Sequence, residues 1–346
     1  MPNKIILALS GLALAVSASI SRAESTDCPD IADDAQRLAC YDRQFRSPPA
    51  AAAVATASAA SAPGRSADLK PPVAASASKM SEDWDLSPDN THSTFEIRKY
   101  KPVYILLGTH TNDINRQPQS ANPTNSVGSP LPGLLSNEAQ FQLSFKTKVW
   151  ENVFGSRGNL WVGYTQSSRW QVYSGGISRP FRETNYEPEA MLMFPTTSSF
   201  AGWDWRVAGI GINHQSNGRA NPLSRSWNRI IGHLGAERGD TSLQIRPWIR
   251  IKEHAEDDNN PGIENYVGRA EVIVAQRLGE HVLSLQGRHS LRFGENSRGS
   301  VKLDWAIPIS GHLKGHLSVF SGYGESMIDY NHRQTMFGAG ISLVEW

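Results

Sequence analysis

The sequence lacks several of the features that commonly identify a protein. Its 346 residues include only two cysteines, and 34 basic residues are balanced by 33 acidic ones. This balance gives no indication of nucleic-acid binding, so no nucleic acid is expected as a partner. The apolar run at residues 5–16 is too short for a membrane-spanning helix, which needs about 20 apolar residues. With a negative mean hydropathy, the chain is not a bundle of transmembrane helices.

The beginning of the chain has the pattern of a secretory signal. Lys4 precedes the apolar run, and small residues follow up to Ala23, where cleavage is expected. Residues 1–23 are therefore predicted to be a signal peptide, and the mature protein to reach an oxidising compartment. Both cysteines, Cys28 and Cys40, lie in the next segment, residues 24–46. We expect a disulfide between them that closes a small helical turn, with two free thiols as the alternative.

A change of composition separates this segment from the rest of the chain. Residues 47–80 consist largely of Ala, Ser and Pro, a composition that cannot build a hydrophobic core. We interpret residues 47–91 as a disordered linker and residues 92–346 as one domain.

Within that domain, segments of about ten residues alternate apolar and polar positions, with turn residues between them. The connections after odd-numbered segments are mostly long and those after even-numbered segments mostly short, as in outer-membrane barrels. The prediction is an all-β fold, a twelve-stranded antiparallel transmembrane β-barrel, with a soluble all-β domain as the alternative. The predicted strands cover residues 94–108, 138–149, 159–171, 184–195, 204–216, 225–236, 240–252, 265–276, 280–289, 299–308, 312–322 and 334–346.

The alternation also predicts which face meets lipid. In residues 242–252, Ile249 and Ile251 share one face, and Arg250 lies on the other. A barrel in a bilayer turns its apolar face outward and its polar face inward. The last predicted strand ends on Trp346, and a terminal aromatic residue is a familiar feature of outer-membrane barrels.

The stretch NHQSNGR, residues 213–219, contains a candidate nucleophile and base. In a strand, residues two apart share a face, so His214 and Ser216 are neighbours on the apolar face of Ile210 and Ile212. The same parity puts Asn228 on the matching face of the next predicted strand. A serine that a histidine deprotonates, with a third group orienting the ring, is the arrangement of a catalytic triad.

Other readings of these residues compete. A His-x-Ser pair is an unspecific motif, and a single histidine near a strand end is usually an interfacial residue. His233 and His254 are rival bases, but parity turns His233 inward. His254 lies in the acidic stretch HAEDDNNPG, which is typical of a solvated loop and has some potential as a calcium site.

Four stretches of the sequence resemble one known family, the outer-membrane phospholipase A of Gram-negative bacteria. They are YTQSSRWQ (164–171), SRPFRETNYEP (178–188), NHQSNGR with SRSWNR (213–229), and SGYGESMIDYN (321–331). The resemblance implies a twelve-stranded barrel that hydrolyses acyl esters of phospholipids and lysophospholipids. It also implies a need for Ca²⁺, activity as a homodimer and residence among outer-membrane lipids. The segment that carries Cys28 and Cys40 would then be periplasmic.

The resemblance assigns roles to individual residues. It implies that Ser216 is the nucleophile, His214 the base, Asn228 the residue that orients the ring, and the Gly218 N–H an oxyanion donor. The implied calcium ligands are the Arg219 carbonyl and the Ser224 hydroxyl, with Ser178 from a partner subunit, and Gln166 matches a polar residue of the dimer interface. Ordinary loop serines, and a glutamine facing the lumen, are the alternatives. Some relatives carry an acid near Asn221, which affects the expected calcium affinity of the monomer.

Two other function classes fit the barrel prediction. A passive porin would conduct ions through a channel lined by Arg246, Arg250 and Lys252, and would hydrolyse nothing. A different outer-membrane esterase, such as a lipid A deacylase, would prefer lipopolysaccharide to phospholipid.

Overall fold

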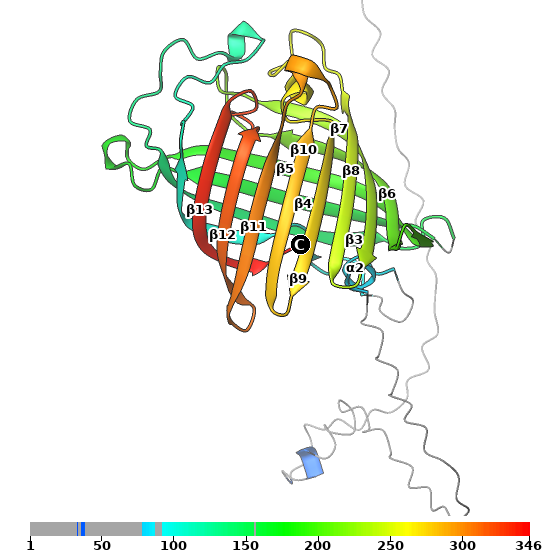
Figure 1. The fold of residues 1–346 in the computed structure, drawn as a ribbon. Coiled ribbons are helices and arrows are strands. Elements are labelled where there is room, and N and C mark those ends of the chain that lie inside the picture. The colour runs from blue at the N-terminus through cyan, green and yellow to red at the C-terminus, as the bar shows by residue number, and fades with distance from the viewer. Residues whose placement is uncertain (1–32, 34–35, 39–77, 87–91, 156) are drawn as a thin grey trace, which may run out of the picture. The chain divides into compact units, whose positions relative to one another are not determined.

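A computed structural model describes residues 33, 36–38, 78–86, 92–155 and 157–346 (Figure 1). The chain divides into two compact units, Met1–Pro71 and Pro72–Trp346. The predicted signal peptide and the proposed Cys28–Cys40 disulfide lie outside the described residues.

The second unit is a closed antiparallel β-barrel, as the strand alternation predicts (Figure 1). Twelve long strands of the described chain pair in sequence order, and β3 pairs with both β2 and β4, which closes the sheet. A short extra strand, β1 (Arg98–Lys99), pairs with the far end of β3. The long strands are β2 (Val103–Thr111), β3 (Asn137–Trp150), β4 (Asn159–Trp170), β5 (Phe181–Phe200), β6 (Trp203–Ser216), β7 (Ser226–Arg238), β8 (Thr241–Ile251), β9 (Ala270–Leu278), β10 (His281–His289), β11 (Gly299–Ser310), β12 (Leu313–Tyr323) and β13 (Arg333–Val344).

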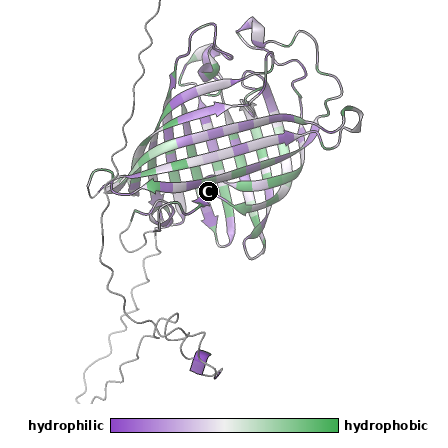
Figure 2. Ribbon diagram, turned by 180° about the vertical axis from the view of Figure 1, so that it is seen from behind, coloured by the Kyte–Doolittle hydropathy of each residue, from purple (hydrophilic) through white to green (hydrophobic). Residues whose placement is uncertain are grey.

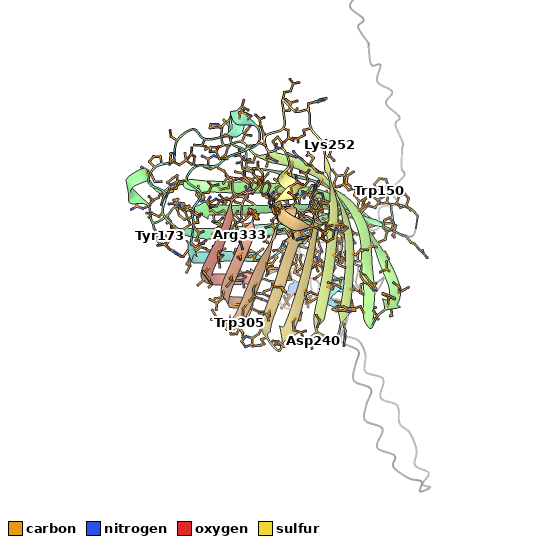
Figure 3. All side chains as sticks on the ribbon, turned by 45° about the horizontal axis from the view of Figure 1, so that its top comes forward. Trp150, Tyr173, Asp240, Lys252, Trp305 and Arg333 are labelled. Atoms are coloured by element: carbon orange, nitrogen blue, oxygen red, sulfur yellow. The ribbon has the colours of Figure 1, made fainter. Side chains whose placement is uncertain are left out.

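The connections have the predicted asymmetry. The turns after β5, β7, β9 and β11 are two residues each, whereas residues 112–136 and 252–269 form long loops at the opposite end. In the part of the chain that the structure describes, four short helical turns lie within long connections. In Figure 3, Asp240 marks the short-turn end and Lys252 the long-loop end of β8. The short helical turns in the long connections are η3 (Pro123–Asn125), η4 (Gly175–Ile177), η5 (Ile263–Asn265) and η6 (Gly294–Asn296).

Hydrophilic and hydrophobic residues are interspersed along the strands (Figure 2), and the apolar ones are exposed on the outer wall, as expected for a barrel in lipid. In β8, Ile249 is 74% exposed on the outer wall, while Trp248 and Arg246 are buried inside. Among the described residues, no helix is long and apolar enough to cross a membrane.

The interior is filled by paired charges. Arg246 lies 3.0 Å from Glu189 and 3.2 Å from Glu271, and Arg229 lies 3.0 Å from Glu187. Buried charges need such partners, because an unpaired ion inside a protein is costly. A cavity of about 160 Å³ remains between these side chains. The interior is thus mostly occupied by side chains.

The folded part begins before residue 92, so the predicted linker, residues 47–91, extends too far. Helix α2 (Lys79–Asp83) and the residues after it pack against the short-turn end of the barrel. Met80 and Trp84 are buried, and Trp84 meets Trp161 edge-on with ring centroids 5.7 Å apart. The Met80 N–H also donates to Glu237, over 2.8 Å.

The two ends of the barrel sequence also differ from prediction. The first long strand covers residues 103–111 instead of 94–108, because Lys101 turns inward and its ammonium pairs with Glu187 at 2.8 Å. The last strand ends at Val344, and Trp346 lines the interior cavity instead of extending the outer wall.

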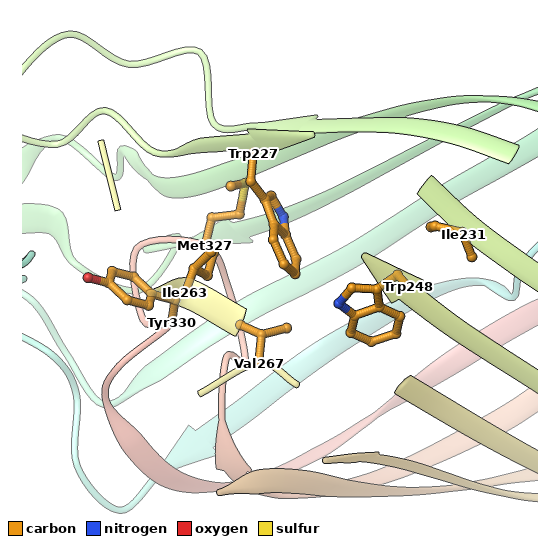
Figure 4. Packing of buried hydrophobic residues seen from close by; sticks show 7 residues of the cluster. All are labelled: Trp227, Ile231, Trp248, Ile263, Val267, Met327 and Tyr330. Carbon is orange, nitrogen blue, oxygen red and sulfur yellow. The ribbon is translucent and has the colours of Figure 1, made fainter. Parts of the chain in front are cut away.

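A hydrophobic cluster inside the long-loop end holds two of the loops in place (Figure 4). Trp227 and Trp248 project from β7 and β8 and meet edge-on, with centroids 6.3 Å apart. Ile263 and Val267 come from the loop after β8, and Met327 and Tyr330 from the loop after β12. Burial of these side chains fixes the base of the loop that follows β8.

Candidate active site

His214 and Asn228 face each other on the outer wall of the barrel. They are register partners on β6 and β7, and His214 Nδ1 lies 2.8 Å from Asn228 Oδ1. Both side chains are half-buried and share their face with Ile212 and Ile230, which are 64% and 40% exposed. The predicted outward direction of the pair is therefore confirmed.

Ser216 ends β6 on the same face as His214. Its backbone register partners are Tyr186 on β5 and Ser226 on β7. Residues two apart in a strand are about 6–7 Å apart along it, so the two side chains are neighbours. In the described part of the chain no hydrogen bond joins the Ser216 hydroxyl to His214. Catalytic hydrogen bonds are often long before substrate binds, so this spacing is compatible with a nucleophile and its base.

The rival histidine on β7 faces inward. His233 Nε2 lies 2.9 Å from a carboxylate oxygen of Glu189, inside the barrel. It cannot reach the outer wall, as its parity with Ile231 predicts.

The loop after Ser216 is fixed by one amide that the sequence analysis did not identify. Asn217 is 3% exposed, and its Nδ2 donates to the Leu223 carbonyl over 2.8 Å. Its Oδ1 accepts from the backbone N–H groups of Arg219 and Arg225 at 3.3 and 3.0 Å. One side chain thus ties both ends of the loop together. Asparagine side chains often hydrogen-bond to nearby backbone groups in turns, so the Asn-Gly pair after Ser216 could have suggested this role for Asn217.

Gly218 follows with a backbone conformation that suits glycine. Its φ is +62°, and a Cβ there would lie 3.2 Å from the ring of Tyr186. The left-handed conformation turns the chain sharply two residues after Ser216.

The predicted calcium ligands Arg219 and Ser224 lie in this same loop. The Ser224 hydroxyl accepts from Asn259 Nδ2 at 3.0 Å, and Asn125 Nδ2 donates to Asn221 Oδ1 at 2.8 Å. In the described residues no group of three or more His, Cys, Asp or Glu side chains could hold a metal, the loop of His254 included. The oxygens near the loop are carbonyl, hydroxyl and amide groups, which are suitable donors for a hard cation such as calcium.

The other two predicted residues lie on the same side of the barrel. Ser178 caps η4 in the long loop between β4 and β5, with φ +60°. Gln166 lies on β4 and faces outward, where it accepts from the Tyr164 hydroxyl at 3.1 Å. The alternative that Gln166 faces the lumen is therefore wrong. Gln166, Tyr186 and Ser216 are register partners in one row across β4, β5 and β6.

Glu253 is a further neighbour of the pair that the sequence analysis missed. Its Oε1 accepts from Asn228 Nδ2 over 2.9 Å. Because Asn228 pairs with Ile251 on β8, the alternation Ile249, Ile251, Glu253 brings this carboxylate to the same outer face. That parity could have revealed it.

Comparison with known proteins gives one consistent family. A family model for phospholipase A1 matches residues 80–343. A phospholipase A1 of Klebsiella pneumoniae is 38% identical over 249 residues, which are 72% of this chain and 82% of that protein.

Solved structures agree with the sequence relatives. Outer membrane phospholipase A from Escherichia coli has a TM-score of 0.66 and 37% identity, and the match covers 72% of this chain and 99% of that one. The outer membrane phospholipase of Salmonella typhi, solved as a dimer with bound calcium, has a TM-score of 0.65 and 37% identity. That match covers 74% of this chain and 94% of the other.

Proposed function

Because this chain belongs to the phospholipase A1 family and is an outer-membrane β-barrel phospholipase, we propose that it hydrolyses phospholipid acyl esters with a Ser216–His214–Asn228 triad. The observation that carries this proposal is the 2.8 Å contact of His214 with Asn228 on the lipid-facing wall, with Ser216 two residues after His214 on the same face of β6. Both acyl ester positions, and lysophospholipids, are proposed as substrates.

The contact with Asn228 Oδ1, an acceptor, favours one tautomer of the base. If Asn228 Oδ1 accepts, His214 Nδ1 carries the proton, and Nε2 has a free lone pair. Nε2 can then take the proton of Ser216 as Oγ attacks the ester carbonyl carbon. The same nitrogen returns the proton to the leaving alcohol, and water later hydrolyses the acyl-enzyme.

The turn after Ser216 would stabilise the oxyanion. The Gly218 N–H lies two residues after the nucleophile, in a loop whose ends the Asn217 amide joins through hydrogen bonds to Leu223, Arg219 and Arg225. A fixed N–H aimed at the developing charge needs no reorganisation during the reaction.

We propose calcium as the cofactor, held by the Arg219 carbonyl, the Ser224 hydroxyl and Ser178 of the partner subunit. When bound, calcium supplies positive charge beside the oxyanion. The calcium-bound dimer of the Salmonella typhi relative supports this proposal. Splitting the ligands between two subunits would make a homodimer the active form, with Gln166 in its interface.

The N-terminal regions complete the proposal. Residues 1–23 would be removed on secretion, and residues 24–46 would form a periplasmic segment with the Cys28–Cys40 disulfide. The linker that follows would end near Ser78, where the folded unit begins.

Replacing the nucleophile tests the proposal. Ser216→Ala should lower phospholipid hydrolysis by a factor on the order of 10⁴–10⁶, because no other group can form the acyl-enzyme. The measurement is release of fatty acid from a defined phospholipid with and without calcium, with barrel folding checked by heat-dependent gel mobility.

Ser321→Ala is the matched control, since Ser321 is an outward-facing serine at the long-loop end of β12. It should keep full activity. Calcium-dependent hydrolysis by Ser216→Ala would overturn the proposal. Ion conductance without hydrolysis would favour the porin, and activity on lipopolysaccharide alone would favour a lipid A deacylase.

A further inference from the structure

The side-chain amide of Asn228 is held at both of its ends. Its Oδ1 lies 2.8 Å from His214 Nδ1, and its Nδ2 donates to Glu253 Oε1 over 2.9 Å. The three groups come from β6, β7 and the residue pair directly after β8. Across the outer wall they form one hydrogen-bonded row that ends on a carboxylate.

We infer that Glu253 is a positioning residue of the catalytic site, which fixes the orientation of the Asn228 amide and thereby the tautomer of His214. This inference rests on the proposed triad, because Glu253 would act on the reaction only through Asn228 and His214.

The reason lies in the hydrogen-bonding capacity of the two groups. An asparagine amide can rotate by half a turn, which exchanges its oxygen and nitrogen, and both orientations fill the same space. An ionised carboxylate only accepts hydrogen bonds, so it stabilises the orientation in which Nδ2 faces Glu253. That orientation directs Oδ1 at His214 Nδ1, and the ring must donate there.

The opposite orientation would disable the base. With Nδ2 turned toward the ring, His214 Nδ1 would have to accept, and the neutral ring would carry its proton on Nε2. A protonated Nε2 cannot take the proton of Ser216. An asparagine, unlike an aspartate, offers both orientations, and so this triad needs a group that selects one of them.

The fold holds Glu253 where this selection requires it. Glu253 continues the outward parity of Ile249 and Ile251, and Asn228 is the register partner of Ile251. The loop that begins at Lys252 is anchored inside the barrel by Ile263 and Val267.

Within the described part of the chain, Glu253 Oε2 is buried and has no hydrogen-bond partner. The charged groups that act on this carboxylate are Arg250, Asp258 and His214. The direct hydrogen-bonded contact of its side chain is therefore with Asn228.

Three substitutions separate the possible roles of this side chain. Glu253→Gln keeps an oxygen that can accept from Asn228, Glu253→Ala removes it, and Glu253→Lys presents a donor that favours the rotated amide. We expect kcat to fall less than about 5-fold in Glu253→Gln and about 10- to 100-fold in Glu253→Ala. In Glu253→Lys kcat should fall further, and KM should change little in all three variants. Folding is checked by heat-dependent gel mobility.

A double substitution then tests the route of the effect. If Glu253 acts through Asn228, then Glu253→Ala in an Asn228→Ala background should change kcat less than about 2-fold. Glu264→Ala is the matched control, because Glu264 lies in the same loop and pairs with Arg250 at 3.4 Å, away from Asn228. It should keep the wild-type kcat.

Each contrary result has one meaning. Activity in Ser216→Ala would overturn the proposed triad itself. If Ser216→Ala is inactive, full activity of both the Ala and Lys variants would overturn only the role of Glu253. Equal losses in the single and double backgrounds would do the same. A Glu253 variant whose kcat recovers fully at higher calcium would also overturn this role, since Glu253 would then contribute to calcium binding.

Discussion

Gly218 shows how one residue can link the fold to the chemistry. It lies between the proposed nucleophile and the loop that carries Arg219 and Ser224, and its φ of +62° is unfavourable for any residue with a Cβ. A Cβ would also press on Tyr186, whose ring lies 3.2 Å away. The direction of its N–H is therefore set by a conformation that glycine adopts without strain.

Gly218→Ala should lower kcat by about 10- to 100-fold, because the oxyanion donor would be displaced while the triad remains. The positive φ itself costs about 1–2 kcal/mol of stability. Fatty-acid release at saturating calcium measures the first effect and thermal unfolding the second.

Gly279→Ala provides the control. Gly279 has the same φ of +62°, no atom lies within 4 Å of its added Cβ, and it lies in a short turn. It should lose similar stability and keep its activity. If both variants lose activity equally, the effect comes from general strain and not from the oxyanion donor.

The alternation of inward and outward residues along strands made part of the candidate site predictable, but it does not extend to the residues beyond the strand ends. His214, Ser216 and Asn228 could be placed because each lies inside a strand with clear alternation. Asn217 and Glu253 lie just beyond strand ends, in loops whose course depends on contacts distant in sequence. The roles of Gly218 and Ser178 came from family resemblance, since no local pattern marks them.

At the scale of elements, the strands were predictable because lipid outside and charge inside enforce a period of two. Helix α2 and the start of the first long strand were not, since Met80, Trp84 and Lys101 are buried by contacts with the barrel interior. Met80 lies in a helix of five residues and Trp84 directly follows it, which is too short a stretch to give a periodic signal. Lys101 is buried through a partner, Glu187, which lies far along the chain.

A buried carboxylate joins this N-terminal element to the barrel. Asp85 is 5% exposed and accepts from Lys148 at 2.9 Å and from His92 at 2.7 Å, with Arg98 also bound to it. Burial alone would raise the pKa of the Asp85 carboxyl, but the hydrogen bonds from Lys148 and His92 and the charge of Arg98 hold this pKa below its usual value.

The sign of the pH effect follows from this lowered pKa. The unfolded Asp85 carboxyl binds a proton at higher pH than the folded one, so the stabilisation is complete above about pH 4 and is lost below it. The unfolding temperature of Asp85→Asn should therefore lie well below that of the wild type at pH 7, with a smaller gap at pH 3.

Thermal unfolding in detergent at both pH values measures the gap. Asp240→Asn is the control, because Asp240 is an exposed residue of a short turn (Figure 3). It should unfold like the wild type at both pH values. An Asp85→Asn gap that does not shrink in acid would show that the side chain stabilises through packing alone.

At the scale of the whole molecule, the candidate active site and the proposed dimer surface lie on one wall. Gln166, Tyr186 and Ser216 occupy one row on adjacent strands, which lie about 4.8 Å apart. A second barrel that contacts Gln166 would therefore lie within about 10 Å of the nucleophile. It could deliver its own Ser178 to the loop of Arg219 and Ser224.

Gln166→Leu should weaken the dimer and leave the chemistry of each site intact. A polar contact in lipid contributes about 1–2 kcal/mol, so its loss raises the dimer dissociation constant by roughly 5- to 30-fold. Activity measured against protein concentration at saturating calcium should shift by that factor and reach the wild-type plateau. Thr335→Val, an outward change on β13, should shift nothing. A lower plateau without a shift would instead place Gln166 in the reaction itself, because only a defect in association is reversed by concentration.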